Sequence, residues 1–597
     1  HILTALLIVP AFAWSAGGSD WHMEPMDPDL QNYPSLQNGF RLYMNYCVGC
    51  HSLQYQRYQR TAEDLRIPED IVLDNLVFTG QKIGERITSA MDNDQAKGWF
   101  GAPPPDLTMV TRVRDEDIDG LEHTNNSVYV KWCEQVSWSH SVALGLDLQP
   151  CQLSADEGIV NRKAHCGELS VPENPARPGG RQIRLHIAVL ESASSSPKAD
   201  PVFFFAGRLG QSNVASFPVA VEALGRALEY RDIVLIDQRG TGRSNPLRCM
   251  EPGDWRDYLL ASSERDSSRV VENCLAQLPA DTRYYTTTLA AADVDRVRRA
   301  LGYARINLFG ASYGSRIAQV YLRNYPEAVR SVILDGVVPT DLALGSEHAG
   351  NVEATLRDLF RRCGNDRDCD QAFPDIEQHY DTLKARVATD QPKLWVIAPR
   401  NGQMVDMKFT AQALALALRV QTYTAGGQAV IPLLIYEAAL ERRYQRLASI
   451  SLMHLDSPLT RERYDGLETS VLCTEDSPRF PDLQRAKQPL LGDTAYRIRQ
   501  RCALWPSGSA PDDFHQPFSS SVPMLVLSGE FDPVTPPRYG DRVLGQYTNA
   551  RHLVMAGQGH GVSGRACMPR LIERFLATAD ALELDASCLE SCLLYTS

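Results

Sequence analysis

A serine lies between two glycines in Gly310-Ala311-Ser312-Tyr313-Gly314, after a short apolar run and before a segment with helical periodicity. A Gly-x-Ser-x-Gly pattern between a strand and a helix is typical of a sharp turn that exposes a nucleophilic serine hydroxyl. Such a turn needs small residues beside the serine, and the helix that follows points its N-terminus at the reacting centre. A Gly-rich connection with a buried serine would show the same short pattern. The flanking strand and helix lead us to predict that Ser312 is a nucleophile.

A serine hydroxyl needs a base within hydrogen-bond reach, and a carboxylate must orient that base. With this elbow, the acid and then the histidine are expected later in the chain. Asp532 comes just past the apolar run 524–527, and His560 lies in a glycine-rich turn. Asp335 also follows an apolar run and competes for the acid role, although an Asp-Gly pair can simply end a strand. We predict Ser312, Asp532 and His560 as nucleophile, acid and base.

Acyl transfer also needs two backbone N–H groups to stabilise the oxyanion that develops on the substrate. One should come from Tyr313, directly after the nucleophile. The other should come from the loop after an earlier strand, residues 205–211.

Short apolar runs alternate with helical patterns after about residue 130, which predicts an α/β fold with a mostly parallel sheet covered on both faces. The predicted strands are 184–190, 202–205, 232–236, 306–309, 331–334, 524–527 and 552–555. A helix is predicted over 288–301, with Thr288 as N-cap and Gly302 as C-cap. Between the fifth and sixth strands the pattern is helical, so we predict a helical cap inserted over the sheet rather than a separate domain.

The chain has 597 residues, 14 cysteines and a net charge of −13, with no long basic run. This length suggests several domains, and the charge argues against nucleic acid or an anionic membrane surface as a partner. Residues 2–16 are apolar and then small, as at the end of a signal peptide, and no later segment suits a membrane anchor. Paired cysteines and this stretch predict a secreted or periplasmic protein.

Cys47-Val48-Gly49-Cys50-His51 is a C-x-x-C-H pattern, typical of c-type haem attachment, although a redox pair would also fit it. The stretches 21–25, 46–60, 76–84 and 99–111 resemble the N-terminal part of bacterial cytochrome c1. The resemblance implies that Cys47 and Cys50 would hold haem c and that His51 would be its proximal ligand. It stops near residue 114, so we expect a truncated segment without a working electron-transfer site.

The part of the chain from about 150 to 588 resembles the α/β-hydrolases that include tripeptidyl aminopeptidases, prolyl iminopeptidases and related esterases. The matching stretches are 166–172, 237–244, 310–314, 325–326, 530–536 and 559–561. The resemblance implies an α/β-hydrolase fold with the same three catalytic residues. It also assigns the second oxyanion amide to Arg208, which stands where the family carries the second glycine of Gly-Gly-Pro-Gly. A side chain there restricts φ and can crowd the acyl pocket.

Two activities remain open for the site. An exopeptidase needs an acidic group to hold a free α-amine, and Glu475 and Asp476 on the predicted cap could do so, unless they are solvated carboxylates beside a disulfide. An ester has the better leaving group and demands less of the oxyanion hole, so the departure at Arg208 favours ester hydrolysis. We therefore predict a serine carboxylesterase, with a tripeptidyl or prolyl aminopeptidase as the alternative and a haem electron carrier as a remote one.

The substrate would be a small-molecule ester or a short peptide, and hydrolysis would require no metal and no cofactor. Cysteines close in sequence predict five disulfides: Cys151–Cys166, Cys249–Cys274, Cys363–Cys369, Cys473–Cys502 and Cys567–Cys588. The expected segments are a cytochrome-like part (1–114), a linker (115–149), a first hydrolase part (150–344), the cap (345–515), a second hydrolase part (516–588) and a tail (589–597). The oligomeric state is not defined by the sequence.

Overall fold

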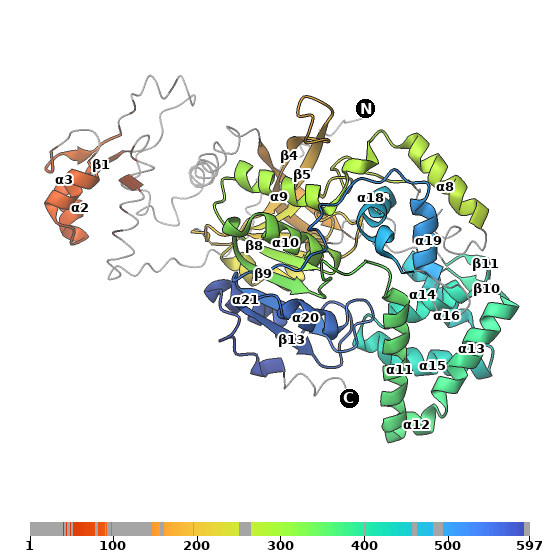
Figure 1. The fold of residues 1–597 in the computed structure, drawn as a ribbon. Coiled ribbons are helices and arrows are strands. Elements are labelled where there is room, and N and C mark those ends of the chain that lie inside the picture. The colour runs from red at the N-terminus through yellow and green to blue at the C-terminus, as the bar shows by residue number, and fades with distance from the viewer. Residues whose placement is uncertain are drawn as a thin grey trace, which may run out of the picture. The chain divides into compact units, whose positions relative to one another are not determined.

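The computed structural model describes residues 37, 40, 43–44, 48, 52–77, 82–89, 91, 97, 146–155, 160–194, 196–249, 264–398, 402–455, 463–481 and 493–589 (Figure 1). The chain divides into two compact units, His1–Trp132 and Cys133–Ser597. The haem motif residues Cys47, Cys50 and His51 lie outside the described residues, as do the predicted linker (apart from 146–149) and most of the tail.

The first unit contains a small core of its own. Its elements are β1 (Leu53–Arg57), α2 (Tyr58–Asp64), α3 (Glu69–Asn75) and β2 (Arg86–Ile87). Strands β1 and β2 pair antiparallel. Tyr58, Ala62, Val72 and Ile87 are buried together and connect the two helices to this pair of strands.

The second unit is built on one large sheet. Among the described residues its nine strands lie in the order β13-β12-β9-β8-β6-β7-β5-β4-β3. Their bounds are β3 (Leu148–Ala155), β4 (Val160–Pro172), β5 (Gln182–Leu190), β6 (Val202–Phe205), β7 (Ile233–Ile236), β8 (Ile306–Ala311), β9 (Val329–Asp335), β12 (Met524–Gly529) and β13 (Ala550–Met555). From β7 to β13 the pairings are parallel, whereas β3, β4, β5 and β7 pair antiparallel. The predicted mostly parallel sheet is therefore confirmed, and the sequence missed β3 and β4.

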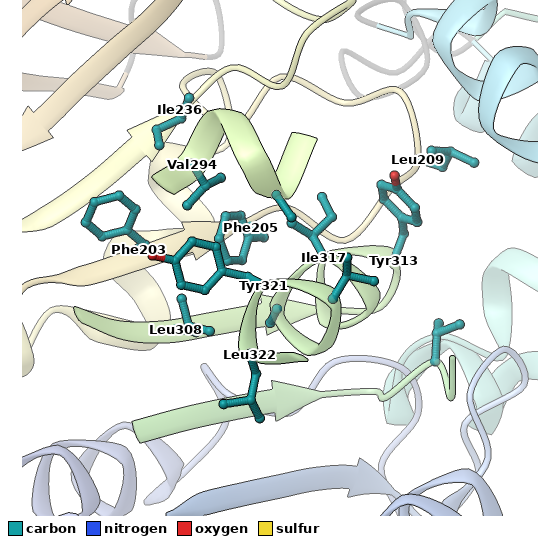
Figure 2. Packing of buried hydrophobic residues seen from close by; sticks show 14 of the residues in the cluster. Phe203, Phe205, Leu209, Ile236, Val294, Leu308, Tyr313, Ile317, Tyr321 and Leu322 are labelled. Carbon is teal, nitrogen blue, oxygen red and sulfur yellow. The ribbon is translucent and has the colours of Figure 1, made fainter. Parts of the chain in front are cut away.

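Helices cover both faces of this sheet. The helices on the sheet are α6 (Phe217–Leu224), α9 (Thr287–Ala300), α10 (Tyr313–Asn324), α20 (Pro537–Leu544) and α21 (Met568–Thr578). Helix α8 (Glu264–Gln277) packs instead against the segments of Cys473 and Trp505. Alternate residues of β6 belong to different cores, because successive side chains of a strand point to opposite faces. Phe203 and Phe205 pack with α9 and α10, whereas Val202 and Phe204 pack with α6 and α21. Figure 2 shows the first of these cores, where α10 lies against the strands.

The N-cap of helix α9 lies two residues earlier in the chain than predicted. Thr286, not Thr288, is the N-cap, and its side chain accepts a hydrogen bond from the amide of Leu289. At the other end the C-cap is Leu301, and Gly302 follows it with φ of 76°. Gly302 thus takes the left-handed position just past the helix, which suits a residue without a Cβ.

The chain between β9 and β12 forms a mainly helical insertion with its own core. Its helices are α11 (His348–Asn365), α12 (Arg367–Ala372), α13 (Ile376–Asp390), α14 (Ala411–Gln421), α15 (Ala425–Leu440), α16 (Gln445–Leu455), α18 (Asp465–Val471) and α19 (Asp493–Cys502). An antiparallel hairpin of β10 (Lys393–Ile397) and β11 (Met404–Lys408), which the sequence did not predict, completes it. Most of these helices gather to the lower right of the sheet in Figure 1. The chain then returns to the sheet, because β12 pairs with β9.

All five predicted cysteine pairs are disulfides: Cys151–Cys166, Cys249–Cys274, Cys363–Cys369, Cys473–Cys502 and Cys567–Cys588. Structural disulfides form and persist in oxidising compartments, so these bonds fit an extracellular or periplasmic protein. In the part of the chain that the structure describes, no helix has the length and apolar character needed to cross a membrane.

Candidate active site

Ser312 lies in the turn between β8 and α10 and has a strained backbone, with φ of 46° and ψ of −117°. A non-glycine residue at positive φ costs free energy and usually persists where function requires it. The two flanking glycines have no room for a side chain. A Cβ on Gly310 would lie 2.5 Å from the carbonyl oxygen of Gly314, and a Cβ on Gly314 would strike the carbonyl of Phe205. The sequence therefore folds into the elbow that the Gly-x-Ser-x-Gly pattern predicts.

Asp532 and His560 are joined by a hydrogen bond of 2.7 Å between the carboxylate Oδ2 and the imidazole Nδ1. Asp532 follows β12 and is buried, and its Oδ1 accepts the backbone N–H groups of Val534 and Thr535, each at 2.8 Å. The Thr535 hydroxyl donates to Asp532 Oδ2 at 2.8 Å and lies 3.1 Å from His560 Nδ1. These hydrogen bonds hold the carboxylate of Asp532 in place, so it is suited to orient His560 and to stabilise it as an imidazolium.

The charges around His560 set its proton affinity. Burial alone would lower the pKa of its imidazole, but the carboxylate of Asp532 outweighs burial and raises this pKa above the ordinary value. Asp335 contributes less in the same direction, and Arg419 opposes both carboxylates. A base whose pKa lies near or above that of free histidine can take a proton from a serine hydroxyl at neutral pH.

Asp335, the competing candidate for the acid, has a different set of partners. Its carboxylate accepts the backbone N–H groups of Val562, at 3.1 Å, and Ser563, at 2.9 Å. Its backbone carbonyl accepts the amide N–H of Ser312 at 2.8 Å. Asp335 therefore connects the nucleophile turn with the loop that carries His560, while Asp532 is the residue that bonds the imidazole.

The structure brings the serine and histidine loops to the same edge of the sheet, at the carboxyl ends of β8, β9, β12 and β13. Gly336, directly after Asp335, lies against the imidazole, since a Cβ placed on it would be 3.0 Å from His560 Cε1. Its φ of 66° also favours glycine. Among the hydrogen bonds of the described residues, none joins the Ser312 hydroxyl to His560. Catalytic hydrogen bonds are often loose without substrate, so this contact is expected to close when substrate binds.

Both amides that were predicted to form the oxyanion hole have acceptors within the protein. The N–H of Tyr313 donates to the carbonyl of Gly207 at 3.0 Å. The N–H of Arg208 donates to Gln211 Oε1 at 3.1 Å. The Gly207 carbonyl and the Arg208 N–H belong to one peptide unit, so one rotation of that unit would release Tyr313 and redirect Arg208 together. The oxyanion assignment stays a prediction that requires this rotation.

Glu475 and Asp476 are buried, so the alternative interpretation of them as solvated carboxylates is wrong. Glu475 accepts hydrogen bonds from the Thr287 amide at 2.6 Å and from the Thr287 hydroxyl at 2.7 Å. Asp476 accepts from Arg316 at 2.8 Å and from the Leu344 amide at 2.7 Å. Burial, followed by repulsion from Asp476, raises the pKa of Glu475 to about 7. Both carboxylates thus support the protein interior beneath the site.

Two supporting residues escaped the sequence analysis. Thr535 follows Asp532 by three residues, and a hydroxyl that close in sequence to the predicted catalytic carboxylate is a usable signal. Tyr423, from the segment after α14, accepts the amide N–H of His560 at 3.1 Å through its carbonyl, and its ring centroid lies 5.6 Å from that of His560. No local pattern marks Tyr423, because this contact joins positions that are 137 residues apart.

Comparisons with known proteins point to two sources of similarity. The N-terminal segment is similar to cytochrome c1 of Allochromatium vinosum, with 49% identity over 116 residues, which is 19% of this chain and 47% of that protein. The chain therefore spans about half the length of that relative. Most of the chain is similar to the serine protease Hip1 of Mycobacterium tuberculosis, with 24% identity over 74% of this chain and 90% of the relative.

A tripeptidyl aminopeptidase of Streptomyces coelicolor is 22% identical, over 76% of this chain and 87% of its own length. Residues 200–563, which include Ser312, Asp532 and His560, match the family described as the alpha/beta hydrolase fold. This match covers more than half of the chain and agrees with the mostly parallel sheet. The chain belongs to the α/β-hydrolase fold family.

Proposed function

We propose that this protein is a serine hydrolase that cleaves carboxylic esters through an acyl-enzyme on Ser312. The observation that carries the proposal is the 2.7 Å bond between Asp532 and His560 at the sheet edge where the strained Ser312 turn lies. A strained serine, an imidazole of raised pKa and a buried carboxylate are the parts that nucleophilic acyl transfer requires.

In the first half of the reaction, His560 removes the proton of the Ser312 hydroxyl while the serine oxygen attacks the ester carbonyl carbon. The carbonyl becomes an oxyanion, which the amides of Tyr313 and Arg208 would stabilise once the Gly207–Arg208 peptide has rotated. The imidazolium then protonates the leaving alcohol, and the acyl group stays on Ser312. A water molecule repeats these steps, which releases the carboxylic acid and restores the serine.

Cleavage of peptide bonds is the second candidate, because the relatives that cover most of the chain are named as a serine protease and tripeptidyl aminopeptidases. The same three residues would carry that reaction. The acidic pair that the sequence offers for a free α-amine, however, already has partners in Thr287, Arg316 and Leu344. For that reason we place ester hydrolysis first.

The test compares p-nitrophenyl acyl esters with aminoacyl and tripeptidyl anilides, on the unmodified protein and on Ser312→Ala. Ester turnover that Ser312→Ala abolishes is the expected result, and Ser196→Ala, at an exposed serine, is the matched control. Anilide turnover without ester turnover would replace the proposal with the peptidase. Full ester activity in Ser312→Ala would overturn both.

Hydrolysis by this route needs no cofactor, and no step of it involves the Cys47-Val48-Gly49-Cys50-His51 motif. We propose that the purified protein carries no covalently attached haem. A visible spectrum tests this directly, because attached haem c would give an intense Soret band.

A further inference from the structure

Arg208 lies in the loop after β6, next to the nucleophile. The preceding residue, Gly207, is so close to the serine that a Cβ on it would lie 3.4 Å from Ser312 Cβ. Both Arg208 and Ser312 are half-buried, so their side chains keep some access to solvent. The position that carries glycine in the resembling hydrolases thus brings a guanidinium to the edge of this site.

Arg419, in the last turn of α14, approaches from the base side. Its Nε donates to the Tyr423 hydroxyl at 2.9 Å, and the Tyr423 ring lies against the imidazole of His560. Only one aromatic residue therefore separates the Arg419 guanidinium from the predicted base. Arg419 is also half-buried.

A third arginine, Arg463, lies in the segment before α18. The loop of Arg208 packs on that segment, because the amide of Tyr464 donates to the carbonyl of Gly210 at 2.8 Å. Arg463 pairs with Glu468, its Nε donating to Oε2 at 2.5 Å. Arg208, Arg419 and Arg463 thus belong to three segments that border the loops of Ser312 and His560.

The pKa values of neighbouring groups show that these guanidinium groups act on one another and on nearby imidazoles. Burial, followed by repulsion from Arg463, lowers the pKa of Arg208 to about 10, which leaves it charged at neutral pH. Burial and then Arg208, Arg419 and Arg463 lower the pKa of His454 to about 4. Burial and then Arg419 lower the pKa of His348 to about 3. Both imidazoles are therefore neutral at pH 7.

We propose that Arg208, Arg419 and Arg463 form a subsite that binds a carboxylate on the acyl part of the substrate. This inference rests on the proposed function. A guanidinium presents a planar fork of N–H donors that matches a carboxylate, and partial burial strengthens such a contact over one in open water. The preferred substrates are then monoesters of dicarboxylic acids, and a substrate with a free amine near the scissile bond is disfavoured.

The test measures kcat/KM for the p-nitrophenyl monoester of adipic acid against p-nitrophenyl hexanoate, which has the same number of acyl carbons but no charge. The methyl p-nitrophenyl diester of adipic acid serves as a neutral polar control. We expect the charged substrate to be preferred by about tenfold at low ionic strength, and salt to reduce this preference. Arg419→Gln and Arg463→Gln should each lower the ratio by roughly threefold or more, because each removes one charge.

The ratio of two substrates within one variant does not depend on how much of the protein has folded. Arg419→Lys keeps the charge and should retain part of the preference, and Arg570→Gln, at an exposed arginine of α21, should leave the ratio unchanged. A wild-type ratio near one, with hexanoate cleaved normally, would overturn the subsite and leave the proposed function standing. Ratios unaffected by both Gln variants would overturn it as well.

A binding measurement separates failure of the subsite from failure of the reaction. Calorimetric titration of Ser312→Ala with monomethyl adipate and with methyl hexanoate needs no turnover. The subsite is supported if Ser312→Ala binds monomethyl adipate more tightly than methyl hexanoate and if adding Arg463→Gln weakens the binding of monomethyl adipate. This result would hold even where no ester is cleaved. Equal affinity for the two compounds, or no binding of either, overturns it.

Discussion

The backbone carbonyl of Asp335 accepts the amide N–H of Ser312 at 2.8 Å. The side chain of the same aspartate holds the amides of Val562 and Ser563, just beyond His560. One residue at the end of β9 therefore fixes the backbone on both sides of the site. Asp532, at the end of the neighbouring strand, contributes the carboxylate that the imidazole needs.

Replacing each of the two aspartates by asparagine should separate these roles. In Asp532→Asn the amide can no longer hold His560 in the tautomer that leaves Nε2 free to accept a proton, so kcat should fall by roughly 10³-fold or more. Asp335→Asn keeps one acceptor for two amides and should lower the thermal unfolding temperature more than it lowers kcat. The measurements are steady-state kinetics on p-nitrophenyl hexanoate and thermal unfolding of both variants.

A larger kcat loss in Asp335→Asn than in Asp532→Asn, with the protein folded, would exchange the two assignments. The equal removal of one negative charge in both variants makes them matched controls for each other.

The pH dependence of kcat/KM should follow His560, which must be neutral to act as the base. Activity on a neutral ester should therefore rise with pH through the pKa of His560 and level off above it. Since Arg419 lowers this pKa, Arg419→Gln should raise it and move the rising limb to higher pH by roughly half a pH unit or less. The loss of activity would then be larger at pH 6 than at pH 9.

Full pH profiles of the unmodified protein, Arg419→Gln and the exposed-site control Arg570→Gln check this. A limb that moves to lower pH in Arg419→Gln would contradict the charge argument.

Arg208→Gly should increase the turnover of neutral esters. Rotation of the Gly207–Arg208 peptide carries the φ of residue 208 into the positive region, which costs a residue with a side chain about 1–2 kcal/mol and costs glycine little. If this rotation limits the reaction, kcat on p-nitrophenyl hexanoate should rise by about fivefold. Arg208→Ala removes the charge but retains the restriction on φ, so it should give no such increase.

Pre-steady-state kinetics of p-nitrophenol release would locate the effect in acylation. An equal increase in Arg208→Ala and Arg208→Gly would assign the effect to the guanidinium and not to the backbone.

Glu475→Gln should stabilise the protein at alkaline pH. The pKa of Glu475 is raised to about 7 in the folded protein, so the folded state binds an extra proton between about pH 4.5 and 7 and loses stability as pH rises through that window. Glutamine resembles the protonated carboxyl. The variant should match the unmodified protein at pH 5 and exceed it at pH 8 by up to about 3 kcal/mol, from about 1.4 kcal/mol per pKa unit.

Chemical denaturation at both pH values measures this difference. A variant that is less stable at pH 8 than the unmodified protein would show that the charged carboxylate contributes through Arg316, which lies 4.0 Å away.

Much of the sheet could be predicted because parallel strands that are buried on both faces are short, continuous apolar runs. Strands such as 202–205 and 524–527 are buried along their whole length and carry no polar side chain that would interrupt the apolar run. β4 escaped because its first four residues, 160–163, are all exposed and polar or charged apart from Val160, and because it pairs antiparallel near the edge of the sheet. The hairpin β10–β11 escaped for a similar reason, since its exposed residues include Trp395 and Ile397.

The parts of the site that could be predicted are those with a local signal. Ser312 has its glycines, and Asp532 and His560 each follow a strand. The direction of the Tyr313 and Arg208 amides could not be predicted, because it depends on the rotation of a single peptide unit. The proposed subsite of Arg208, Arg419 and Arg463 could not be predicted either, because three separate segments of the chain supply these residues.

The segment after α14 is bonded through its backbone to the loop of His560. A lid that swung open on a hinge would have to break this bond and would pull the imidazole away from its partner. We therefore expect the Tyr423 end of the insertion to stay in place when substrate enters. Deleting the insertion to widen substrate access would therefore also remove a contact that holds His560.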